Sequence, residues 1–219
     1  MKLLTVLCAC ALVVHLGVEC AASFVDEMVA GPAYRHRRFR TMVQPDRIKL
    51  QKALGIKWWR GMMWSVPVSS PWKAAFDGTK RSTFSHTYTI ISPEGKGFNG
   101  TGLWAQNTAC DHIPIWHDGA AVKFHMFADG GIYKQVVLGN PLNYDGAKFV
   151  FVIPKLTFYM VESTSDKNYA FISFASVPGW TMESHKDFSL KDMEAKFPAH
   201  SAIFKAVATP GKSGSHIHI

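Results

Sequence analysis

The chain has few charged residues, since Asp, Glu, Lys and Arg together make up only 18% of its 219 residues. Such a low charge content is not typical of a disordered or coiled-coil protein. The hydrophobic fraction of 47% and the aromatic fraction of 13% are sufficient for a packed core. The length therefore fits one folded domain with a targeting segment, or at most two small domains.

Long hydrophobic runs are also lacking, except at the beginning of the chain. Lys2 supplies a positive charge, residues 3–18 are almost all apolar, and the small residues Cys20 and Ala22 follow. This order predicts a secretory signal peptide over residues 1–22, with Cys20 and Ala22 at the −3 and −1 positions of the cleavage site. The apolar run is shorter than the roughly 20 residues that a membrane anchor needs.

Cysteine is scarce, and three of the four cysteines lie within the predicted signal peptide. Cleavage leaves Cys110 as the single cysteine, so the mature domain cannot form an internal disulfide. The domain must then be stabilised by its hydrophobic core. A lone cysteine of this kind is more often an unreactive buried thiol than a nucleophile.

Positive charge is concentrated just after the predicted signal peptide. The chain has a formal net charge of +8, and residues 34–40 contain four arginines. With Phe24 near the new terminus, residues 23–44 resemble the transit peptide of precursors in algae with secondary plastids, which predicts delivery to the thylakoid lumen. A basic propeptide of a secreted protein is the alternative. The remaining lysines are scattered, so no nucleic-acid partner is expected.

Alternating apolar and polar residues predict a β-rich domain over residues 45–208, followed by a flexible tail over residues 209–219. Turn signals at residues 93–97 and 129–131 predict hairpins. A short helix is predicted over residues 47–54, and a second helix begins after the capping box at Ser189. The eight predicted strands cover residues 56–68, 83–92, 98–106, 120–128, 132–138, 149–153, 156–162 and 169–177.

Eight short strands joined mostly by tight turns predict an all-β fold, an antiparallel up-and-down barrel with one helix at each end. A barrel of eight strands has room for one small ligand. Many positions expected to face inward are aromatic, which favours a flat or polyene-like apolar ligand. The predicted ligand contacts are Trp58, Phe84, Phe124, Tyr133, Phe149, Phe151, Phe158 and Phe171.

Several local motifs resemble those of the lipocalins. The stretch from Gly55 to Trp58 opens the first predicted strand, as a glycine–tryptophan motif does in that superfamily. Lys57-Trp58-Trp59, Phe76-Asp77, the run from Tyr88 to Phe98 and the run from Tyr169 to Phe174 are similar to the lipocalin domain of violaxanthin de-epoxidase and its algal relatives.

This resemblance implies a carotenoid ligand and reduction of xanthophyll epoxides with ascorbate as co-substrate. Asp77 matches the family's Phe-Asp position, and it is implied to be the proton donor, with Tyr88 orienting or donating beside it. A turn residue before Gly78 is the other interpretation of Asp77. No tightly bound cofactor is expected, and a peripheral contact with the thylakoid membrane or a pigment–protein complex is a further expectation.

Other interpretations remain open from the sequence. A non-catalytic carrier of hydrophobic ligands and a structural subunit of a pigment–protein complex both fit an aromatic-lined barrel. Asp111-His112 and His117-Asp118 can bind a metal or form an acid–base pair, but loop polarity explains them equally well. A third ligand is missing from both pairs, so no metal site is predicted.

Overall fold

The computed structural model describes residues 44–59, 62–93 and 103–207. The predicted signal peptide, almost all of the basic segment, the turn at residues 94–97 and the tail lie outside the described residues. In the part of the chain that the structure describes, no helix is both long and apolar enough to cross a membrane.

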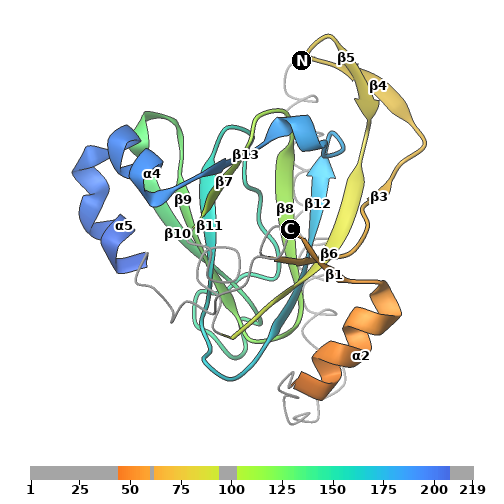
Figure 1. Ribbon diagram of the computed structural model, residues 1–219, viewed down its shortest axis with the longest axis vertical. Helices are drawn as coiled ribbons and strands as arrows, with labels where there is room; N and C mark the ends of the chain where they lie inside the picture. The colour runs from red at the N-terminus through yellow and green to blue at the C-terminus, as the bar shows by residue number, and fades with distance from the viewer. Residues whose placement is uncertain (1–43, 60–61, 94–102, 208–219) are drawn as a thin grey trace, which may run out of the picture. The chain divides into compact units, whose positions relative to one another are not determined.

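Two antiparallel sheets make up most of the described fold (Figure 1). The first sheet has the strand order β1-β2-β6-β12-β8, with β3 also paired to β6, and the second has the order β10-β9-β11-β7-β13. The first sheet contains β1 (Lys57–Trp59), β2 (Met62–Trp64), β3 (Val68–Ser69), β6 (Ser85–Ile91), β12 (Ala170–Val177) and β8 (Asp111–Gly119). The second contains β10 (Tyr133–Leu138), β9 (Val122–Phe127), β11 (Phe158–Ser163), β7 (Trp104–Asn107) and β13 (His185–Phe188).

Helices and one separate hairpin complete the described chain. The hairpin of β4 (Lys73–Phe76) and β5 (Thr79–Ser82) pairs with neither sheet. Helix α2 (Gln44–Leu54) confirms the predicted N-terminal helix, and α4 (Leu190–Lys196) begins at the predicted capping box of Ser189 and Asp192. The remaining elements are α5 (Ser201–Val207) and the 3-10 turns η1 (Asp129–Gly131), η2 (Met182–Ser184) and η3 (Pro198–His200).

The core lies between the two sheets. Ile91 and Phe174 of the first sheet are buried in one cluster with Phe124 and Tyr159 of the second. A second cluster lies on the other face of the second sheet, where α4 and α5 cover Trp104, Phe127 and Phe158 with Met193 and Phe204. Figure 1 shows these two helices over β9, β10 and β11.

The predicted up-and-down barrel is wrong, because the strands do not pair in sequence order. Strand β12 lies between β6 and β8, and β7 lies between β11 and β13. Strands β6 and β7, which the sequence predicts to form a hairpin, belong to different sheets. The predicted strand over residues 149–153 has only isolated bridges. Between the predicted strands over residues 98–106 and 120–128, where no strand is expected, the chain forms the long strand β8. The hairpin predicted at residues 129–131 is confirmed, because β9 and β10 pair antiparallel on either side of this turn.

Close backbone approach at Gly139 leads to a stability prediction. A Cβ atom at Gly139 would lie 2.7 Å from the Cβ of Ala121, which is closer than atoms pack. Gly139→Ala is therefore expected to lower the free energy of unfolding by about 1–3 kcal/mol, measured by urea denaturation. Adding Ala121→Gly removes the opposing methyl group, so the double variant should be more stable than Gly139→Ala alone. A Gly139→Ala protein as stable as the parent would contradict this packing.

Candidate functional site

A cavity of about 400 Å³ opens between the two sheets, and its walls carry both aromatic and polar side chains. This volume is within the range of small-molecule sites in proteins. Trp58, Trp64, Phe174 and Trp180 supply aromatic surface. The polar residues on the wall include His112, Tyr159, Ser176, His185 and Asp187. The cavity is thus a mostly apolar chamber with a few convergent polar groups.

The strand alternation explains why these polar residues share one chamber. Successive side chains of a strand point to opposite faces, so residues two apart lie on the same face. On β13, His185 and Asp187 face the cavity, whereas Phe188 packs against the helix-covered cluster. On β12, Phe174 and Ser176 face it in the same way. His112 is brought to the cavity by β8, directly opposite Ser176.

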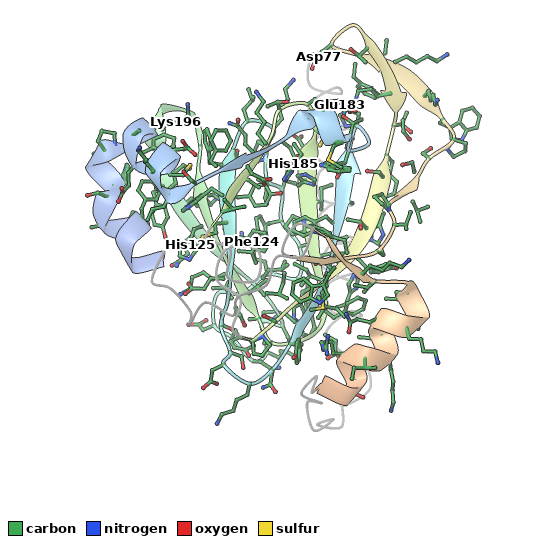
Figure 2. The ribbon with its side chains drawn as sticks, in the orientation of Figure 1. Asp77, Phe124, His125, Glu183, His185 and Lys196 are labelled. Carbon is green, nitrogen blue, oxygen red and sulfur yellow. The ribbon has the colours of Figure 1, made fainter. Side chains whose placement is uncertain are left out.

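His185 and Asp187 form a hydrogen-bonded pair on the cavity wall. The Nε2 atom of His185 lies 2.9 Å from Oδ1 of Asp187, and the two side chains keep 14% and 32% of their surface exposed. Figure 2 shows His185 on β13, on the side of the second sheet that faces β12. A carboxylate in this position orients the imidazole ring. The pair can therefore take up a proton from a bound molecule.

His112 is buried and uncharged. Burial lowers its pKa from 6.5 to about 3, and the nearby charge of His185 acts in the same direction. Its Nδ1 atom lies 3.0 Å from the Ser176 hydroxyl. Its Nε2 atom has no hydrogen-bond partner among the described residues. His112 therefore lines the cavity as a neutral imidazole, and its Nε2 atom is itself buried.

Tyr159 is the hydrogen-bond donor that remains protonated in this site. Burial raises the pKa of its hydroxyl, and the charges of Cys110 and Asp187 raise it further. The Asn107 side chain donates to the hydroxyl oxygen over 3.4 Å. The rings of Tyr159 and His112 meet edge to face with their centroids 6.0 Å apart. Tyr159, the neutral His112 ring and the His185–Asp187 pair therefore line one cavity.

Histidine and carboxylate side chains are common metal ligands, so the cluster has to be tested as a metal site. The described residues contain no group of three or more His, Cys, Asp or Glu placed to hold a metal ion. Oδ1 of Asp187 is hydrogen-bonded to Nε2 of His185, and Nδ1 of His112 is hydrogen-bonded to the Ser176 hydroxyl. These residues do not fit a metal, and no chemical step is assigned to one.

The two residues named as catalytic from the sequence lie apart from this cavity. Asp77 has a positive φ of 47° in the β4–β5 turn, and its exposed carboxylate pairs with Lys155 at 3.1 Å. This setting supports the turn interpretation of Asp77. Tyr88 lies on the other face of the first sheet, where it stacks on Phe171 with ring centroids 5.6 Å apart and also contacts His117. The structure therefore does not bring Asp77 and Tyr88 together.

Trp58 alone among the predicted ligand contacts lines the cavity in the described structure. Phe124 and Phe151 pack into the core between the sheets. Phe158 and Tyr133 lie on the opposite face of the second sheet, under or beside α4 and α5. The physical reason is that a two-sheet fold has more than one buried face, and period-two alternation does not distinguish them.

The other three predicted contacts lie toward the outside of the fold. Phe84 is 40% exposed and Phe149 is 46% exposed. Phe171 packs beside Tyr169 against the cluster beneath α2. An aromatic residue in a strand is therefore a poor indicator of this cavity.

Sequence reasoning missed Tyr159, Ser176, His185 and Asp187 as site residues. It considered His112, but only as a pair with Asp111. These two neighbours point to opposite faces of β8, and Asp111 accepts a hydrogen bond from the backbone N–H of Lys155. The signal that was available is the spacing of His185 and Asp187, because residues two apart in a strand lie on the same face.

Comparison with known families and structures identifies a different family from the one that the sequence motifs indicated. A family model described as "Cupin superfamily (DUF985)" matches residues 25–188. No curated protein is significantly similar to the chain. The match overturns the resemblance to lipocalins and to violaxanthin de-epoxidase, and with it the carotenoid-binding interpretation. The expectation of ascorbate depended on that resemblance and stays untested.

Solved structures agree with this match at the level of the fold. A hypothetical protein from Leishmania major is 17% identical, has a TM-score of 0.63, and aligns over 74% of this chain and 97% of its own. Protein SO0799 from Shewanella oneidensis is 20% identical, has a TM-score of 0.59, and aligns over 74% of this chain and 96% of its own. The two-sheet arrangement described above is the double-sheet jelly roll of cupins.

Proposed function

The chain belongs to the DUF985 family of the cupin superfamily, and on this premise we propose that its cavity binds a small organic molecule and catalyses proton transfer on it. The site supports general acid–base chemistry, because a candidate base and a candidate acid line the same chamber. The substrate class that fits is a compound with an acidic C–H bond beside a carbonyl group. Removal of that proton and its return at another position or face is the simplest reaction of this kind.

His185 is the proposed base. Its pairing with Asp187 at 2.9 Å holds the ring in one orientation, as a general base requires. Asp187 is the only carboxylate on the cavity wall in the described chain, and it is already used by this pair. Asp187 is therefore a positioning residue.

Tyr159 is the proposed acid. Its raised pKa keeps the hydroxyl protonated at neutral pH, so it can donate to a developing oxyanion. Trp64 and Phe174 pack together beside it with ring centroids 5.6 Å apart, and they limit the access of water. The observation that carries the proposal is this convergence of the His185–Asp187 pair and a protonated tyrosine on one cavity of about 400 Å³.

Exchange of carbon-bound hydrogen for deuterium tests the proposal directly. A panel of small carbonyl compounds is incubated with the full-length protein in D2O, and loss of the α-proton signal is followed by NMR. We expect at least one compound to exchange, and Tyr159→Phe or His185→Gln to slow exchange by about a hundredfold or more. His86→Gln is the matched control, because His86 lies outside the cavity lining and contacts Phe84 and Tyr88.

The possible outcomes separate an enzyme from a binding protein. Exchange that persists unchanged in both cavity variants would contradict the assigned roles. Binding of panel compounds without any exchange would show that the cavity is a binding site only. In either case the fold and the family would be unaffected.

The secretory route is part of the same proposal. Cleavage after residue 22 is expected, with further trimming to about residue 44 if the destination is a plastid. The family match begins at residue 25, so it includes the basic segment. Terminal sequencing of the native protein measures the cleavage site, and an intact Met1 would refute the targeting prediction.

A further inference from the structure

We propose that Tyr133 is a nucleophile activated by His125 and Glu162, and that its hydroxyl accepts an acyl group from activated esters. The three residues lie on the outer face of the second sheet, and none of them lines the cavity between the sheets. The proposal therefore concerns a second site, and it does not depend on the proposed function. It rests on the geometry of three hydrogen-bonded side chains.

Strand pairing brings the three side chains together. Phe124 and Met126 of β9 point into the core, so His125 between them points to the opposite face. Figure 2 shows His125 on the side of the second sheet that carries α5, and Phe124 on the other side. Tyr133 of β10 and Glu162 of β11 belong to the two strands that pair with β9, and each is a diagonal neighbour of His125.

Both ring nitrogens of His125 have a partner. Nδ1 lies 2.8 Å from the Tyr133 hydroxyl oxygen, and Nε2 lies 3.0 Å from Oε2 of Glu162. The His125 side chain is only 5% exposed, whereas that of Glu162 is 19% exposed. Tyr133 is also partly exposed. The base is thus buried between its two partners, and the hydroxyl beside it lies where a reagent can reach it.

The carboxylate decides the direction of both hydrogen bonds. An ionised carboxylate only accepts, so Nε2 of a neutral His125 ring carries the hydrogen and donates to Glu162. The positive charge of Lys123, the direct partner of Glu162 in the sheet, lies 3.7 Å from the same carboxylate oxygen. Nδ1 is then a lone pair, and the Tyr133 hydroxyl donates to it. The proton of Tyr133 therefore points at a base.

A nucleophile bonded to a base, with the base oriented by a third group, is the arrangement of nucleophilic catalysis. Acyl transfer to Tyr133 needs no reactant besides the ester. The tyrosine oxygen forms a bond to the acyl carbon, its proton passes to Nδ1 of His125, and the bond from the acyl carbon to the leaving oxygen breaks with its electron pair. Glu162 is a positioning residue, because it fixes the ring and its tautomer.

Tyr133 is poorly suited to the ordinary reaction of a tyrosine, which proceeds through the ionised hydroxyl. Burial raises the pKa of the Tyr133 hydroxyl, and the negative charge of Glu162 raises it further. Without help from His125, Tyr133 should react more slowly than a tyrosine with an ordinary pKa. With that help it should react faster at neutral pH. The two mechanisms therefore predict opposite orders of reactivity.

Acylation by 4-nitrophenyl acetate tests the proposal in the full-length parent protein. Acetylated sites are mapped by mass spectrometry after short reactions at pH 7, with Tyr144 as the internal reference. Tyr144 is partly exposed like Tyr133, and it has no hydrogen bond to a histidine among the described residues. We expect Tyr133 to be acetylated at least about tenfold faster than Tyr144. Equal or slower acetylation of Tyr133 would overturn the proposal, and this comparison needs no variant.

Rapid hydrolysis of the Tyr133 ester is counted through the leaving group. Release of 4-nitrophenolate is followed by absorbance in the parent protein and in Tyr133→Phe. We expect the parent to release it faster, whether the acetyl group stays on Tyr133 or is hydrolysed. Identical release by the two proteins, with no acetyl group on Tyr133, would also overturn the proposal.

Variants of the two supporting residues test their roles. His125→Gln removes the base, so acetylation of Tyr133 should fall to the rate of Tyr144 or below it. Glu162→Gln should also slow the reaction, since the amide does not hold the ring as one tautomer. Gln135→Ala is the matched control, because Gln135 is the exposed direct partner of His125 on β10 and should not affect the rate. Fast acetylation that persists in His125→Gln would contradict the role of the base.

The pH dependence distinguishes a chemical role of His125 from a structural one. A tyrosine that must first ionise reacts about tenfold faster for each pH unit below a pKa of about 10. Acetylation of Tyr133 in the parent should rise less steeply than this above pH 7, because base assistance does not require the ionised hydroxyl. In His125→Gln the steep rise should return. A steep rise in the parent would show that Tyr133 reacts as an ordinary tyrosine, and the proposal would fall.

Discussion

Lowering the pH from 7 to 4 is expected to destabilise the parent protein more than the variant His112→Gln. The pKa of His112 is about 3 in the folded protein and about 6.5 when the ring is free in water. Between these values the unfolded chain binds a proton that the folded chain does not. The contribution of this residue to stability is therefore complete above pH 6.5 and is lost as the pH falls.

The expected size of this effect is large for a single side chain. Each pH unit below about 6 should remove about 1.4 kcal/mol from the free energy of unfolding, until the folded-state pKa is reached. Between pH 6 and pH 4 the parent is then expected to lose about 2–3 kcal/mol more than His112→Gln. The measurement is urea denaturation followed by tryptophan fluorescence at several pH values.

A second histidine provides the control for this comparison. His86 is partly exposed on the outer side of the first sheet, and burial lowers its pKa as well. His86→Gln should flatten the pH dependence in the same direction but to a smaller extent. Identical pH profiles for the parent and His112→Gln would show that the His112 ring is not buried as described.

The positions of several strands could be predicted from the sequence, but their pairing could not. Period-two alternation correctly predicts strands at β6, β9, β10, β11 and β12, and the DGG turn correctly predicts the β9–β10 hairpin. The alternation of apolar and polar residues indicates which residues of a strand share a face, but it does not indicate which other strand pairs with it. The pairing of β12 with β6 and β8 joins segments far apart in the chain, and only tertiary packing decides it.

The candidate site depends on that missing information. His112 and Ser176 are 64 residues apart, and they meet because β8 and β12 are neighbours in one register. Tyr159 comes from the other sheet. The His185–Asp187 pair is local, and its spacing could have been recognised in the sequence. Its position in a cavity could not, because β13 pairs with β7 at the edge of the second sheet.

The misleading resemblance has a physical explanation of the same kind. A tryptophan pair at the start of a strand and a Phe-Asp turn are local features, and each occurs in many β-proteins. Trp58 does line a cavity, but Asp77 lies in an exposed turn where its positive φ and its contact with Lys155 explain it. Local motifs of this kind indicate strands and turns, and they do not separate one β architecture from another.

Two phenylalanines that the sequence places together in one ligand site are expected to behave differently when truncated. Phe124 is completely buried between the sheets, with ring centroids 5.1 Å from Phe151 and 6.2 Å from Phe174. Phe124→Ala removes these contacts and leaves a void, so a loss of about 3–5 kcal/mol in the free energy of unfolding is expected. Phe84 is 40% exposed, and Phe84→Ala should cost less than about 1 kcal/mol.

Urea denaturation of the two variants measures this difference, with the slope of the transition as a check that both unfold in the same way. Because Phe174 lines the cavity and contacts Phe124, the Phe124→Ala variant should also bind cavity probes less tightly. Phe84→Ala should not affect binding, since Phe84 contacts His86 on the other side of the sheet. Small and equal stability losses would mean that both rings face an open lumen, as the barrel prediction requires, and would contradict the two-sheet core.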